Sequence, residues 1–344
     1  MPDTLRVLSI DGGGIRGLVP ALVLEELERR LKAKGKTEPL HAYFDLIAGT
    51  STGGIIAAGL AAPHPQDMTR PAATPAELVA LYRNQGGDIF DRTFFRTARK
   101  AFANVFSGNF SGVVEEKYPH GPLEEKLKTT LGGRRISDAL TSVLITAYDI
   151  AERTTVVMKK RPLRPGEAPH DDFLFWQAAR ATSAAPTYFE PARVANLTTG
   201  RSMTLVDGGV YANNPSVCAF VEAHKMGASS ETMLLVALGT GHQNRAYSYY
   251  ETRNWGPINW INPAHGAPII SILMHGQAHT AAHQLELLLN GGPQTNYYRF
   301  DAELAGVNDE MDDASDENLA ALERFARRLI EAESAKLDAI VERL

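Results

Sequence analysis

The chain has 344 residues, 44% of them hydrophobic, and a formal net charge of −5 at pH 7. This size allows a large buried core, and a mildly acidic balance without a basic block argues against nucleic-acid binding. A single cysteine, Cys218, excludes an internal disulfide and fits a reducing compartment. There is no signal-peptide pattern and no run near the ~18 apolar residues of a membrane span, so the sequence predicts a cytoplasmic protein, in contact with membranes only peripherally.

Strand-like apolar runs alternate with helical periodicities along the chain. The first run, 5–10, leads into a glycine-rich stretch, and apolar residues at helical spacing then predict a helix over 19–34 that ends at Gly35. Alternating strands and helices predict an α/β fold, a three-layer sandwich with a mostly parallel central sheet and an active site at the carboxyl ends of its strands. The further expected strands cover 43–48, 143–149, 154–158, 203–206 and 233–238, and the further expected helices cover 55–61, 173–184, 269–289 and 317–344.

The stretch after the first strand, SIDGGGIRGL, matches a phosphate-binding pattern. Gly12, Gly14 and Gly17 fit G-x-G-x-x-G, which cradles a dinucleotide pyrophosphate. That site needs an acidic residue at the end of the second strand, where this chain has only AGTS, and Asp45 comes too early. A P-loop would need Lys-Ser or Lys-Thr after the glycines, and neither pair follows. A transition-state oxyanion is therefore the favoured anion.

The second strand ends in GTSTG, which is a G-x-S-x-G nucleophile elbow with a strand before it and a helix after it. This turn forces the central side chain, Ser51, outward, and the following helix directs its N–H groups and positive dipole end toward the site. A serine in a helix N-cap region is the alternative, and it is a common one. The strand–turn–helix context favours the nucleophile.

A nucleophilic serine needs a group of donors for the oxyanion that forms during acyl transfer. The glycine-rich loop offers clustered backbone N–H groups, and we assign the donors to Gly12, Gly13 and Gly14. Arg16 is either an electrostatic support for this loop or a surface arginine at the start of a helix.

A nucleophilic serine also needs a base, and the stretch VDGGVYANNP places Asp207 at the end of a strand, before two glycines. Taken alone, Asp-Gly is a common turn pair; beside the other two motifs, a catalytic role is favoured. The usual triad would add a histidine, and His242 after GTG is the first alternative base. His275, His279 and His283 recur every four residues on an expected helix. Without an acidic partner or HExxH they indicate a solvated helix face rather than a metal site.

Three motifs in this order, DGGGIRG, GTSTGG and DGGVYANNP, resemble the patatin-like phospholipase family. ARATSAAPTYFEP, LGTG and NYYRFD also match, so the likeness runs from about residue 5 to 301 of one domain over 1–344, with a helical segment at about 316–344. The resemblance implies a patatin-like fold and a Ser–Asp dyad in which Ser51 is the nucleophile and Asp207 its partner. It also implies an oxyanion hole in the DGGG loop and no metal or organic cofactor.

Three functional classes follow from these motifs. The first is a lipid acyl hydrolase of the phospholipase A or lysophospholipase type, which cleaves fatty-acyl esters of membrane glycerolipids or phospholipids. The second is the same chemistry in a regulated effector that degrades membranes in bacterial defence or host attack. The third is a non-enzymatic nucleotide-binding protein that uses the glycine loop.

Two aromatic segments are candidates for lipid contact. The stretch 88–106 mixes five phenylalanines with four cationic residues, which suits either an interfacial lid or a cap helix that packs its phenylalanines inward. The stretch 247–260, with Tyr249, Tyr250, Trp255 and Trp260, is either a lipid contact or a partner interface. The acidic run 309–317 is interpreted as a solvated connection before the last helix.

Overall fold

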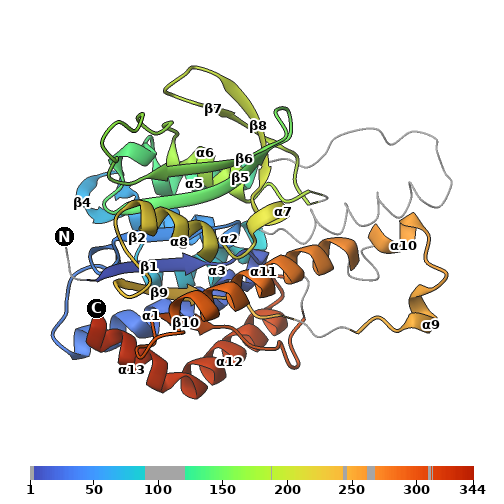
Figure 1. Ribbon diagram of the computed structural model, residues 1–344. Coiled ribbons are helices and arrows are strands. Elements are labelled where there is room, and N and C mark those ends of the chain that lie inside the picture. Colours follow the sequence, from blue (N-terminus) through green and yellow to red (C-terminus); the bar gives the residue numbers. More distant parts are fainter. Residues whose placement is uncertain are drawn as a thin grey trace.

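The computed structural model describes residues 4–89, 121–186, 188–242, 246–261, 268–308, 311 and 313–344. Most of the 88–106 segment, for which lid and cap remain alternatives, lies outside these residues. A central sheet of eight strands runs through the described part, in the order β10-β9-β1-β2-β5-β8-β7, with β6 paired to β5 (Figure 1). Within the same residues, none of the helices combines the length and apolar character that crossing a bilayer requires.

Five strands form the parallel part of the sheet, and three antiparallel strands extend it beyond β5. The expected α/β class with a mostly parallel central sheet is confirmed. The parallel strands are β1 (Leu5–Ile10), β2 (Leu46–Gly49), β5 (Ser142–Asp149), β9 (Met233–Leu238) and β10 (Tyr297–Phe300), and the antiparallel ones are β6 (Thr154–Lys160), β7 (Ala192–Ala195) and β8 (Ser202–Asp207).

Helices cover both faces of the sheet because successive residues of its central strands alternate between two apolar cores. Val7 and Leu235 pack into a core shared with one set of helices, whereas Leu8 and Val236 belong to a larger core on the opposite face. The smaller core includes α8 (Ser216–Lys225) and α11 (Pro268–Leu289), and the larger one includes α1 (Leu18–Ala33), α2 (Thr52–Ala61), α3 (Pro75–Ile89), α5 (Gly121–Leu131), α6 (Phe175–Thr182), α12 (Asp316–Ala332) and α13 (Ser334–Arg343).

The expected strands 5–10 and 233–238 have the observed bounds, and most other expected elements differ only at their ends. The helix expected over 317–344 is wrong as a single element, because the chain breaks at Glu333 between α12 and α13. Arg30 of α1 donates hydrogen bonds to the backbone and hydroxyl oxygens of Ser334 at this break. Because of this break, both α12 and α13 pack on α1, whereas a single straight helix would continue away from it.

The structure also contains elements that the sequence analysis does not predict. They include the hairpin of β3 (Pro63–His64) and β4 (Asp67–Pro71), the edge strands β7 and β10, and the helices α3, α5, α7 (Gly209–Ala212), α8, α9 (Tyr249–Thr252) and α10 (Pro257–Ile261).

Phe325→Ala should destabilise the protein by about 3–5 kcal/mol, because Phe325 is buried in the larger core together with residues of α1. Urea unfolding measures this change in the free energy of unfolding. The matched control is Arg327→Ala on the same helix, where the side chain is 72% exposed and a change within about 0.5 kcal/mol is expected. Equal effects of the two substitutions would show that α12 is not part of this core.

Candidate active site

Ser51 lies between β2 and α2 in a backbone conformation that few residues other than glycine adopt. Its φ is 54° and its ψ is −125°, and such a geometry costs of order 1–3 kcal/mol, for which the surrounding structure must compensate. Position 53, two residues after Ser51, must be glycine because β1 passes close to it: a Cβ there would lie 2.2 Å from the Ile10 carbonyl oxygen. The Ser51 side chain makes no capping hydrogen bond to α2, so the N-cap alternative does not account for this serine.

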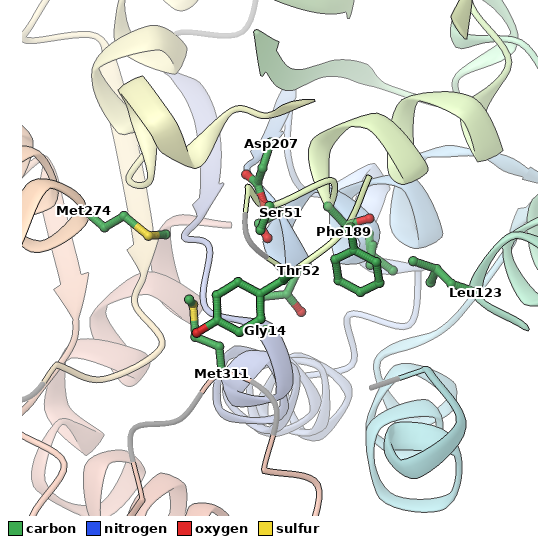
Figure 2. A pocket seen from close by; sticks show the side chains of 12 residues that line it. Gly14, Ser51, Thr52, Leu123, Phe189, Asp207, Met274 and Met311 are labelled. Atoms are coloured by element: carbon green, nitrogen blue, oxygen red, sulfur yellow. The ribbon is translucent and has the colours of Figure 1, made fainter. Parts of the chain in front are cut away.

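Asp207 reaches the same level of the sheet as Ser51 from the other side of β5. Gly49 pairs with Ile145 and Asp207 pairs with Ala147, so the residue two positions after Gly49 and the last residue of β8 lie at equal height. Figure 2 shows the two side chains pointing toward each other in one cavity. The structure therefore brings together the two residues that sequence reasoning singled out.

The Asp207 carboxyl is 2% exposed and only partly hydrogen-bonded. Oδ1 accepts a hydrogen bond from the Gly209 N–H at 2.7 Å, whereas Oδ2 accepts none of ordinary geometry within the described part of the chain. Burial raises the pKa of Asp207 to about 7, although the Ser51 hydroxyl and the Gly209 N–H both act to lower it. A carboxyl with this pKa is suited to take and return a proton near neutral pH.

The glycine loop after β1 lies directly against Ser51. A Cβ on Gly12 would lie 2.4 Å from Asn213 Oδ1 and 3.1 Å from Ser51 Cβ, so only glycine fits. Of the three expected donors, Gly12 has its N–H bonded to the Asn213 carbonyl oxygen at 3.0 Å. The N–H groups of Gly13 and Gly14 make no hydrogen bond to any described residue, which leaves them available to a ligand.

Arg16 supports the glycine loop from within it. Its Nε donates to the Gly13 carbonyl oxygen at 3.2 Å, and its Nη1 donates to the Gly241 carbonyl oxygen, also at 3.2 Å. Arg16 thus connects the loop after β1 to the loop after β9, instead of extending from the surface.

A pocket that is partly open to solvent lies beside Ser51 (Figure 2). Apolar side chains form most of its wall, and the two polar groups of the Ser51–Asp207 pair lie at its floor. An apolar lining around a reactive polar pair suits a substrate whose reactive polar group is attached to an aliphatic chain. The lining residues are Gly14, Ser51, Thr52, Ile55, Leu123, Ser183, Ala185, Tyr188, Phe189, Asp207, Met274 and Met311.

His242 is not among the residues that line this cavity. Its Nδ1 lies 3.5 Å from Asp301 Oδ2, and the hydrogen bond to that carboxylate raises the pKa of His242. Its ring centroid is 5.7 Å from that of His275, which is in turn 6.1 Å from that of His279. Among the residues described here, no group of three or more His, Cys, Asp or Glu side chains could hold a metal ion.

Four contributors to the site lack a clear signal of their own in the sequence. Thr182 Oγ1 accepts the Ser51 N–H at 2.9 Å, and Asn213 and Thr240 both contact Gly12. These three residues lie in the motifs ATSAAP, NNP and LGTG, but the motifs do not indicate which of their side chains contacts the site. Met311 falls in the acidic run that was interpreted as a solvated connection. That interpretation is wrong for this residue, because it lines the cavity and its carbonyl oxygen accepts the Ile15 N–H.

Comparisons with known proteins agree with the site motifs. The family model described as Patatin-like phospholipase matches residues 8–216. Patatin-like protein 2 of Arabidopsis thaliana is 33% identical, covering 98% of this chain and 85% of that protein, and patatin-like protein 2 of Oryza sativa subsp. indica is 31% identical over 97% and 85%. Patatin-2-Kuras 4 of Solanum tuberosum is 31% identical over 97% and 88%. Among solved structures, VipD from Legionella pneumophila aligns with a TM-score of 0.40 and 13% identity, over 95% of this chain and 67% of that one. With its family model matched over more than half of its length, and with relatives above 30% identity along nearly all of it, the chain belongs to the patatin-like phospholipase family.

Proposed function

We propose that this protein is a serine lipid acyl hydrolase that cleaves fatty-acyl esters of membrane glycerolipids through Ser51 and Asp207. The observation that carries the proposal is the buried Asp207 carboxyl beside the Ser51 hydroxyl. Among the described residues its Oδ2 accepts no hydrogen bond of ordinary geometry, and burial raises its pKa to about 7. A carboxylate of ordinary pKa would be a poor acceptor for a serine proton. This one is basic enough to act without a histidine.

The reaction proceeds through an acyl-enzyme. Asp207 accepts the hydroxyl proton as Ser51 Oγ bonds to the ester carbonyl carbon, and the carbonyl oxygen becomes an oxyanion that the Gly13 and Gly14 N–H groups stabilise. The oxyanion collapses, the alcohol leaves with the proton from Asp207, and the acyl group remains on Ser51. Water then attacks that ester, Asp207 again takes the proton and returns it to Ser51, and the fatty acid is released.

The apolar cavity wall supports a fatty-acyl substrate over a small polar ester. Ile55, Leu123 and Phe189 offer the aliphatic and aromatic surface that an acyl chain buries. Leu273 of α11 precedes Met274, which lines the cavity, and is 60% exposed. Tyr250 of the stretch 247–260 is 79% exposed. Exposed apolar and aromatic side chains of this kind suit peripheral contact with a membrane surface.

Labelling with a fluorophosphonate tests the proposed function, because such probes react with an activated serine next to oxyanion donors. The full-length protein should be labelled at Ser51, as peptide mass spectrometry will show, and should release fatty acid from phospholipid vesicles. Preincubation with the probe should stop the release. A protein that remains unlabelled, or that is labelled only at other serines, contradicts the assignment of Ser51.

A further inference from the structure

We propose that Thr240 is a positioning residue that fixes the orientation of the Gly13 N–H toward the oxyanion, an inference that rests on the function proposed above. Thr240 lies in the loop after β9, far from Ser51 in the sequence, and is 4% exposed. Its hydroxyl donates a buried hydrogen bond of 2.8 Å to the Gly12 carbonyl oxygen. None of its atoms lines the cavity, so it acts through the backbone of the glycine loop.

The geometry of the peptide bond connects this hydrogen bond to the oxyanion donor. The Gly12 carbonyl and the Gly13 N–H belong to one planar trans peptide, in which the two groups point in opposite directions. Holding the carbonyl oxygen against Thr240 therefore turns the N–H away from Thr240. Gly14, the next residue, lines the cavity beside Ser51, and on this inference the Gly13 N–H faces the same cavity.

The next peptide is held in the same way by Arg16. The Gly13 carbonyl oxygen accepts hydrogen bonds from both the backbone N–H and the Nε of Arg16, each at 3.2 Å, and this fixes the direction of the Gly14 N–H. Each of these two N–H groups, which bond to none of the residues that the structure describes, thus has the carbonyl of the same peptide bound on the other side. The Gly12 N–H is bonded to the Asn213 carbonyl oxygen and is therefore not one of the two proposed donors.

The position of the hydroxyl is itself defined, because the loop that carries Thr240 is anchored on both sides. The Gly239 N–H donates to the Phe300 carbonyl oxygen at 2.8 Å, and the Gly241 N–H donates to Asp301 Oδ1 at 3.0 Å. Asp301 is paired with Arg299 at 3.0 Å. Although burial acts against it, the Arg299 charge lowers the pKa of Asp301 to about 2, so this anchor is a carboxylate at neutral pH.

Close packing leaves no room for another arrangement at this contact. A Cβ on Gly13 would lie 2.3 Å from the Thr240 hydroxyl oxygen. The hydroxyl therefore lies directly against the loop backbone. Its loss removes this contact and the shorter of the two hydrogen bonds to the Gly12 carbonyl oxygen, the other coming from Asn213 Nδ2 at 3.5 Å.

The test is the pair T240A and T240S, which differ by a single oxygen atom. We expect T240A to lower kcat on a soluble short-chain ester at least about tenfold with KM nearly unchanged, since the lost interaction forms in the transition state. T240S should keep kcat within a few-fold of the original protein. Inhibition by an aliphatic trifluoromethyl ketone, which forms a tetrahedral adduct with the serine, should weaken in T240A in parallel with the fall in kcat/KM.

The matched control is T141A. Thr141 lies just before β5, at the end of that strand opposite to the site, and its hydroxyl donates a hydrogen bond of 2.6 Å to the Phe44 carbonyl oxygen. This substitution should leave kcat unchanged. Equal kcat for T240A and T240S, or a T240A effect confined to KM, overturns the role of Thr240. Hydrolysis that does not depend on Ser51 would instead overturn the proposed function, so the two failures are distinguishable.

A crystal structure of the unaltered protein with the ketone bound decides the question if T240A does not fold. The adduct oxygen should lie about 3 Å from the Gly13 and Gly14 nitrogen atoms, with the Thr240 hydroxyl still on the Gly12 carbonyl oxygen. An adduct on Ser51 whose oxygen points elsewhere, or a Gly12–Gly13 peptide that has turned away from Thr240, would contradict the inference.

Discussion

Ser51→Ala should reduce ester hydrolysis at least about 10⁴-fold, to the residual rate that the oxyanion donors and substrate binding supply alone. The nucleophile is lost, while its neighbours remain in place because the Ser51 side chain makes no capping bond that the helix needs. Initial rates on a soluble ester and on phospholipid vesicles measure the change. Near-normal turnover in this variant would mean that another residue is the nucleophile.

Ser51→Gly separates the chemistry from the backbone strain at this position. It should be as inactive as the alanine variant, yet more stable than it by about 1 kcal/mol. Glycine adopts a φ of 54° without steric cost, and this gain exceeds its greater freedom in the unfolded chain. Urea unfolding of the two variants gives the difference. If the alanine variant proves the more stable one, the elbow does not store strain.

Asp207→Asn should lower kcat by about 10³-fold without loss of the fold, because it removes the proton acceptor but keeps its volume. The amide oxygen can still accept the Gly209 N–H that now bonds to Oδ1. In the unaltered protein, kcat/KM should rise with pH in a single titration step centred near pH 7, because the Asp207 carboxyl must be ionised to accept the proton. An unchanged rate in the variant, with a titration step at the same pH, would direct the search for a base to His242.

The same substitution should stabilise the protein at alkaline pH. The pKa of Asp207 is raised from 3.8 to about 7 by burial, so the folded protein favours the neutral carboxyl. The stability that this preference supplies is complete below the unfolded pKa and is lost as the pH rises through 7. Asparagine is neutral throughout, so its melting-temperature advantage should grow between pH 5 and pH 8. A constant difference would show that the Asp207 carboxyl is not desolvated in the folded state.

The parts of the fold that the sequence predicted well are those whose signal is local. β9 is a continuous apolar run and β1 is a mainly apolar one, and a glycine motif follows each, so their bounds follow from these features. The edge strands and the break at Glu333 depend on partners elsewhere in the chain. Arg30, for example, fixes that break from α1, and nothing in the periodicity of the last 30 residues shows it.

The candidate site divides in the same way. Ser51 follows from the strand–turn–helix pattern, since an elbow needs glycines at fixed positions. Asp207 was expected at a strand end, but the reason for its burial is that β8 runs antiparallel to β5 and enters the sheet from the edge where the site lies. The contacts of Thr240 and Met311 with the glycine loop join residues more than 200 positions apart. No spacing rule reaches that far.

The position of β1 in the middle of the sheet has a consequence for how the chain is made. β1 leaves the ribosome before both of its neighbours and can pair with β2 soon afterwards, but its other neighbour, β9, begins only at Met233. At ~5–20 residues per second, translation leaves that side of β1 unpaired for on the order of ten seconds or more. An open strand edge next to an apolar face attracts other chains. The glycine loop, which is continuous with β1 and is bound by Thr240 in the loop after β9, therefore reaches its final arrangement only after that later loop has been made. Until then, a growing chain would hold Ser51 without the scaffold that orients the Gly13 and Gly14 N–H groups.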